Sequence, residues 1–115
     1  MTQDKPTDAQ LVALAERLGW TVLVEPQGLW LFSETDETVD DHPLSWLRTP
    51  DGALGAIQAA MAGLGYDFYL QQQIGAGATA SFDGTQPGQI SRTAHADSAP
   101  VAIVLAACAA LGVPS

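Results

Sequence analysis

The stretch TAHADSAPVAIVLAACAALG, residues 93–112, decides the fold that we expect for this chain of 115 residues. It opens with the end of a strand. Asp97 or Ser98 then caps a helix whose first turn tolerates Pro100. Gly112 ends that helix. One helix face carries the larger apolar residues Val101, Val104, Leu105, Cys108 and Leu111. Alanines fill much of the rest, so the helix is expected to lie flat and close against a sheet.

Two further helices are predicted upstream. Residues 7–10, Thr-Asp-Ala-Gln, fit a capping box, and apolar residues follow at helical spacing until Gly19 ends the helix. The middle helix begins at Thr49-Pro50-Asp51, which combines a cap, a first-turn proline and an acid at the positive end of the helix dipole. Its glycines lower helicity by roughly 1 kcal/mol each, so tertiary packing must hold it. Its expected buried stripe is Leu54, Ile57, Met61 and Leu64.

Five short strands are predicted, at residues 20–24, 29–32, 66–74, 78–82 and 89–96. The near-continuous apolar run of residues 29–32 indicates burial on both faces, as between two helical layers. The order α-β-β-α-β-β-β-α therefore predicts a single α+β domain over residues 1–115. We expect a three-layer α/β/α sandwich with a mainly antiparallel sheet. Residues 1–6 are expected to form a disordered tail and residues 34–42 an acidic loop.

The charge balance restricts the partners. Four basic residues against thirteen acidic ones give a formal charge of −9. Nucleic-acid phosphates and anionic membranes would repel such a chain, whereas a basic protein surface would attract it. Simple solubility is the alternative explanation. The single cysteine excludes an intrachain disulfide, and the longest apolar run is too short to cross a membrane. We therefore expect a cytoplasmic protein.

No catalytic signature is found. Gly75-Ala76-Gly77 lacks the third glycine and the following helix of a dinucleotide site, and a hairpin turn is favoured. The acidic run with His42 lacks the ligand spacing of a calcium loop. Cys108 is expected to behave as a small apolar residue. His95 and Asp97 share a strand end without a third catalytic group. We predict no enzyme, no cofactor and no metal site.

The acidic run at residues 34–41 is the strongest candidate contact surface. It carries five carboxylates and no base, so we expect it to be solvated. Its carboxylates would mimic nucleic-acid phosphates toward a basic groove, and the nearby tryptophan would supply an apolar anchor. The predicted partner-binding residues are Glu34, Asp36, Glu37, Asp40, Asp41 and Trp46.

Three segments resemble the small bacteriophage and prophage proteins with a phage ABA sandwich domain. Residues 11–20, LVALAERLGW, are similar to the family's opening, and residues 43–51, PLSWLRTPD, to its loop before the middle helix. Residues 94–103, AHADSAPVAI, resemble its closing motif and are the most specific match. The chain departs from the family pattern by an insertion before Asp51 and by Val104 and Leu105 in the final helix. The resemblance implies an α/β/α fold and a phage-related origin, with no established enzymatic activity.

These observations lead to three hypotheses. The first is a non-enzymatic phage or prophage accessory protein of the host cytoplasm that binds a host or phage protein with a basic surface. An inhibitor of a host defence system, similar to the anti-CRISPR proteins, is one version of it. The second is a structural or assembly module that acts as a homo-oligomer. The third is a small ligand-binding protein or enzyme that uses His95 and Asp97.

Overall fold

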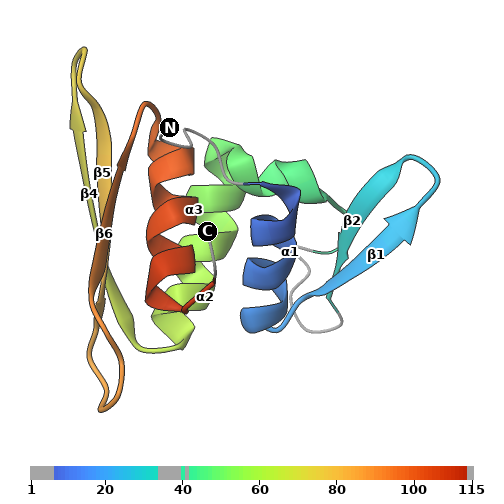
Figure 1. Cartoon of the computed structure of the whole chain (residues 1–115), viewed down its shortest axis with the longest axis horizontal. Helices are drawn as coiled ribbons and strands as arrows, with labels where there is room; N and C mark the ends of the chain where they lie inside the picture. Colours follow the sequence, from blue (N-terminus) through green and yellow to red (C-terminus); the bar gives the residue numbers. More distant parts are fainter. Residues whose placement is uncertain (1–6, 34–39, 41, 114–115) are drawn as a thin grey trace.

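In the part of the chain that the structure describes, three α-helices, a 3-10 helix and a short π-helix are combined with two small antiparallel sheets (Figure 1). The computed structural model describes residues 7–33, 40 and 42–113. One sheet has the strand order β1-β2-β3 and the other β4-β5-β6. The predicted α+β class is confirmed. In chain order the elements are α1 (Asp8–Arg17), β1 (Thr21–Glu25), β2 (Gly28–Phe32), β3 (His42–Pro43), η1 (Leu44–Arg48), η2 (Asp51–Ile57), α2 (Gln58–Gly63), β4 (Tyr66–Gln73), β5 (Gly77–Gly84), β6 (Arg92–Ala96) and α3 (Ala99–Ala110).

The layering differs from the expected α/β/α sandwich. Figure 1 shows α2, α3 and α1 between the two sheets, so that helices form the middle of the molecule and strands the outside. The reason lies in α3, which is apolar on every side rather than on one face. Such a helix must be covered all round, and it therefore takes the central position instead of an outer layer. The buried residues of α3 are Ala99, Val101, Ala102, Ile103, Val104, Ala106, Ala107, Cys108 and Ala110.

The β4-β5-β6 sheet packs against α3 through one face only. Along β5, Ala78, Ala80 and Phe82 are buried and alternate with half-buried polar residues. The alanines leave room for α3 to lie close to the sheet, as expected from its own alanine content. On the opposite face, cross-strand pairs join Thr79 to His95 and Ser81 to Thr93 by side-chain hydrogen bonds. One face of this sheet is thus core and the other is a polar surface.

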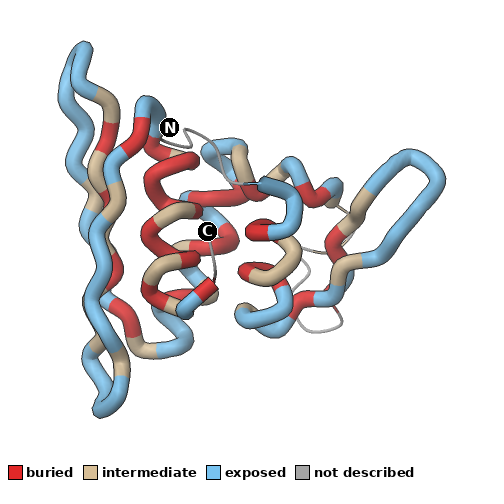
Figure 2. The backbone as a smooth tube through the Cα atoms, viewed as in Figure 1, coloured by how far each residue is buried: buried red, intermediate tan, exposed pale blue. Residues whose placement is uncertain are grey.

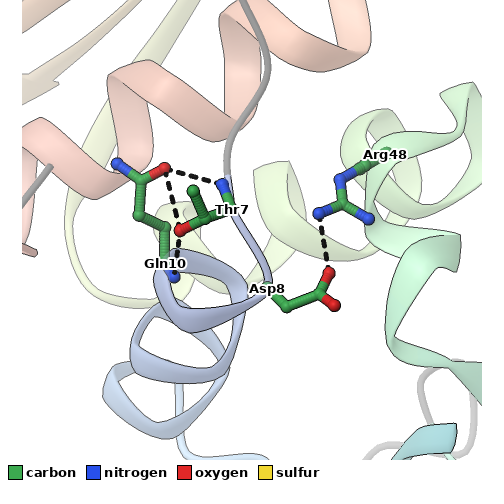
Figure 3. A network of polar contacts seen from close by, with 4 residues as sticks. All are labelled: Thr7, Asp8, Gln10 and Arg48. Carbon is green, nitrogen blue, oxygen red and sulfur yellow. Dashed lines mark hydrogen bonds and ion pairs between the residues drawn. The ribbon is translucent and has the colours of Figure 1, made fainter. Parts of the chain in front are cut away.

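The first helix begins as predicted. Thr7 and Gln10 form the capping box: the Thr7 hydroxyl accepts a hydrogen bond from the Gln10 backbone N–H, and Gln10 Oε1 accepts one from the Thr7 backbone N–H (Figure 3). Arg48 of η1 donates to the Asp8 carboxylate over 2.8 Å. The start of α1 is therefore satisfied locally and also joined to a segment forty residues away.

The middle helical segment is less regular than predicted. Residues 51–57 form a π-helix and only residues 58–63 an α-helix. Thr49 does cap it, since its hydroxyl accepts from the Gly52 backbone N–H. Ile57 and Met61 are buried as expected, but Leu54 and Leu64 are exposed. The wider π-turn shifts the helical spacing, and Ala53 and Ala56 face the core in place of the leucines.

The β1–β2 hairpin projects from the body of the molecule (Figures 1 and 2). Of its residues, only Leu31 is buried, which makes the expected burial of residues 29–32 on both faces wrong. The hairpin rests on α1 and η1 through a single face, so the other face has no helical layer over it. Within the described ranges, no helix is both long and apolar enough to span a membrane.

Candidate functional site

The predicted acidic loop is only partly represented in the structure. Glu34, Asp36, Glu37 and Asp41 lie outside the described residues. Asp40 is half-buried, and its Oδ1 accepts a hydrogen bond from the Ser33 backbone N–H at 3.3 Å. Asp40 therefore lies next to the end of β2.

Trp46 lies in η1 and contacts both His42 and the hydrophobic core. Its ring stacks on the ring of His42, with centroids 4.0 Å apart and planes inclined by 9°. The Trp46 carbonyl accepts a hydrogen bond from the Thr49 hydroxyl at 2.6 Å, and its side chain packs partly on the core. Its contact with a partner stays a prediction.

The outward face of the β1–β2 hairpin is apolar. In the strand register Leu23 lies opposite Trp30 and Thr21 opposite Phe32. Since alternate residues of a strand share a face, these side chains lie on one side and the buried Leu31 on the other. Leu23 is 40% exposed and Phe32 37%, while Trp30 is half-buried. Aromatic and aliphatic residues thus reach solvent where no helix covers them.

A hollow of about 130 Å³ lies on this face. Its apolar lining comes from Leu23, Trp30 and Phe32. Two carboxylate residues, Glu25 at the end of β1 and Asp40 of the acidic run, belong to the same lining. Gln27 and Leu31 complete it, and none of the described residues that line it is basic. We call this feature the hairpin hollow. Of the acidic run, the described residue Asp40 lines the same hollow as Trp30.

His95 and Asp97 belong to different surroundings. His95 Nδ1 shares a hydrogen bond of 2.9 Å with the Thr79 hydroxyl on the exposed face of the second sheet. Asp97 lines another hollow, of about 420 Å³, between the β4–β5 turn and the start of α3, in which it is the only titratable lining residue. An acid–base pair is therefore not assembled in that hollow.

Cys108 is buried in α3. Burial raises the pKa of its thiol to about 11, an effect that the positive charge of Arg17 partly offsets. At neutral pH the thiol is therefore protonated and a poor nucleophile. In the described part of the chain, no group of three or more histidine, cysteine, aspartate or glutamate side chains is placed to hold a metal ion.

Sequence reasoning missed Leu23, Glu25, Trp30 and Phe32 as a common surface. Their alternation in the two strands was available in the sequence, but the apolar residues between them hid it. Leu31 and Val22 occupy the other face, so the run reads as continuously apolar. Only the register of the hairpin separates the residues that face the core from those that face solvent.

Comparison of the chain with models of known protein families, with curated proteins and with solved structures finds no match. The resemblance to the phage ABA sandwich family thus stays a prediction.

Proposed function

We propose that this protein acts by binding another protein, as a non-enzymatic phage or prophage accessory protein directed at a basic surface of a host or phage protein. The observation that carries the proposal is the outward face of the β1–β2 hairpin, where Leu23, Trp30 and Phe32 stand uncovered beside Glu25 and Asp40. Apolar residues that are grouped, exposed and bordered by polar ones are typical of protein-interaction surfaces.

The acidic charge supports a basic partner. A net charge of −9 attracts a positively charged surface over a distance and raises the rate of encounter. The acidic run follows β2 closely in the chain, and its Asp40 is bonded to Ser33 at the end of the hairpin. A surface of this composition suits an inhibitor that occupies a nucleic-acid groove of a host defence protein, and we propose this version for the host cytoplasm.

The test is capture of partners from a host lysate by the immobilised protein, at low and at high salt. We expect capture to weaken when Glu34, Asp36, Glu37, Asp40 and Asp41 are replaced by Asn, Gln and Ser, and its salt dependence to flatten. The control is replacement by Asn of two acids on the β4-β5-β6 sheet, the exposed Asp67 and the half-buried Asp83. Capture that is equal in all three proteins, or absent at low salt, contradicts the proposal.

A second candidate function is self-assembly through β1. This strand is the edge of its sheet, and its residues 21–25, Thr-Val-Leu-Val-Glu, contain neither lysine nor proline to discourage pairing. Val24 is 85% exposed on it. Light scattering after size-exclusion chromatography distinguishes the candidates. A symmetric dimer that Val24→Lys dissociates supports self-assembly, and a monomer at all concentrations removes it.

A further inference from the structure

The hairpin hollow combines three kinds of chemistry. Leu23 and Phe32 offer apolar surface, Trp30 an aromatic ring, and Glu25 and Asp40 two negative charges, the first next to the hairpin turn and the second bonded to Ser33 after β2. Asp40 keeps an acceptor oxygen beyond the one bonded to the Ser33 N–H, because a carboxylate has two oxygens. Such a lining suits a ligand with an apolar stem and a positively charged end.

Lysine and arginine side chains have this composition. Their methylene stems pack on apolar surface while the charged head stays at the rim, and the head is attracted both by carboxylates and by the face of an aromatic ring. Tryptophan is the strongest aromatic partner for a cation. Apolar, aromatic and acidic contacts thus favour the same kind of side chain.

We propose that the hairpin hollow seats a lysine or arginine side chain of a partner protein. The inference rests on the proposed binding function and names the group that is recognised. The stem lies on Leu23 and Phe32, and the charged head lies between Trp30 and the carboxylates of Glu25 and Asp40. The hollow is small and open, on a hairpin that projects from the body, so a side chain presented by another surface reaches it readily.

Charge argues against a second copy of this chain as the occupant. Two copies of charge −9 repel each other before contact. A partner rich in basic residues meets no such repulsion, and it gains from every carboxylate around the hairpin.

The experiment is a titration followed by NMR at the Trp30 indole N–H. The probes are three short glycine-serine peptides that differ at one position, which holds lysine, arginine or norleucine. Norleucine keeps the stem of lysine and lacks its charge. We expect the lysine and arginine peptides to shift the Trp30 signal, and the norleucine peptide to bind at least about tenfold more weakly.

Two double variants separate the hollow from the overall charge. Glu25→Gln with Asp40→Asn removes the carboxylates of the hollow, while Asn at position 40 still offers an oxygen to Ser33. Asp67→Asn with Asp83→Asn removes two carboxylates that face each other in the other sheet. Both lower the net negative charge equally. We expect the first to weaken binding of the lysine peptide by about tenfold and the second by no more than about twofold.

Several results overturn the proposal. They are an unmoved Trp30 signal, equal binding of the norleucine peptide, equal losses in both double variants, and a Trp30 shift caused by raising the concentration of the protein alone. The last result identifies a second copy as the occupant. A further result is partner capture by the full chain that survives Glu25→Gln with Asp40→Asn and yet is lost when the acidic run is neutralised. That result refutes the hollow as the binding site and leaves the proposed function standing. Capture that neither change affects refutes both.

Discussion

Gly52 determines how closely η1 and η2 approach. A Cβ atom at this position would lie 2.1 Å from the Trp46 carbonyl oxygen and 2.9 Å from Leu47 Cα, both backbone atoms that have little freedom to move. Gly55, one turn further along the same π-helix, has open space around it. Two glycines of one element thus have opposite roles, and only the contacts distinguish them.

We expect Gly52→Ala to destabilise the protein by about 3 kcal/mol, because the added methyl group forces two backbone segments apart. Gly55→Ala is the matched control and should stabilise by about 0.5–1 kcal/mol, since alanine restricts the unfolded chain and fits the helix. Urea unfolding followed by circular dichroism measures both. Equal effects of the two substitutions would show that the η1–η2 contact is not a constraint.

Ionisation of the Cys108 thiol makes the free energy of unfolding depend on pH in the alkaline range. Its pKa is raised from 9.0 to about 11 by burial, so above pH 9 the unfolded state loses the thiol proton before the folded state does. The unfolded state then binds fewer protons, and the free energy of unfolding falls as pH rises. The stabilisation that comes from the protonated Cys108 thiol is fully present below pH 9, and roughly 2–3 kcal/mol of it is lost by pH 11. Urea midpoints between pH 8 and 11 measure the slope, which should be shallower in Cys108→Ala.

At the scale of elements, α1 links the two halves of the molecule. It contacts α3 on one side and β1 on the other, and Asp8 in its first turn binds Arg48 of η1. That ion pair joins exposed groups and is worth about 0–1 kcal/mol. The capping box and the buried leucines, Leu11 and Leu14, therefore contribute more to the helix than its salt bridge does.

Thr7→Ala should accordingly cost about 1 kcal/mol, because the Gln10 backbone N–H loses its acceptor at the start of α1. Thr7→Ser keeps the hydroxyl and should stay within about 0.5 kcal/mol of the parent protein. Thermal or urea unfolding compares the two. A cost of the same size in both variants would assign it to the threonine methyl group instead of the cap.

At the scale of the whole molecule, stability is unevenly distributed. The helix α3 alone contains nine buried residues, whereas the β1–β2 hairpin has only Leu31 buried (Figure 2). Elements with few buried apolar contacts open at low free energy. The part of the molecule that we propose for binding is therefore the part that the core holds least firmly.

Hydrogen exchange followed by NMR should reveal this difference. We expect the amides of β5 and α3 to exchange slowest, through global unfolding, and those of β1 to exchange by local opening at least about a hundredfold faster. A basic partner bound to the hairpin should slow exchange in β1 alone. Uniform protection across both sheets would mean that the hairpin unfolds only with the core.

Much of the local structure followed from the sequence. The capping box at residues 7–10, the cap at Thr49 and the apolar run of residues 101–110 each lie within a few residues of the group they satisfy, so short-range chemistry predicts them. The α+β class followed from the order of these elements. The start of α3 was partly misjudged, because Ser98 occupies the cap position without forming a side-chain hydrogen bond.

The sequence by itself therefore determined the elements, their class and the acidic charge. Only the tertiary structure decided that two sheets enclose the helices, that Leu54 faces solvent, and that Glu25 and Asp40 line the same hollow as Trp30. These features depend on strand register and on which side of a helix is covered. Both are set by contacts between residues far apart in the chain. Burying the fully apolar α3 on all sides contributes more free energy than the local preferences that the periodicity of a single segment expresses.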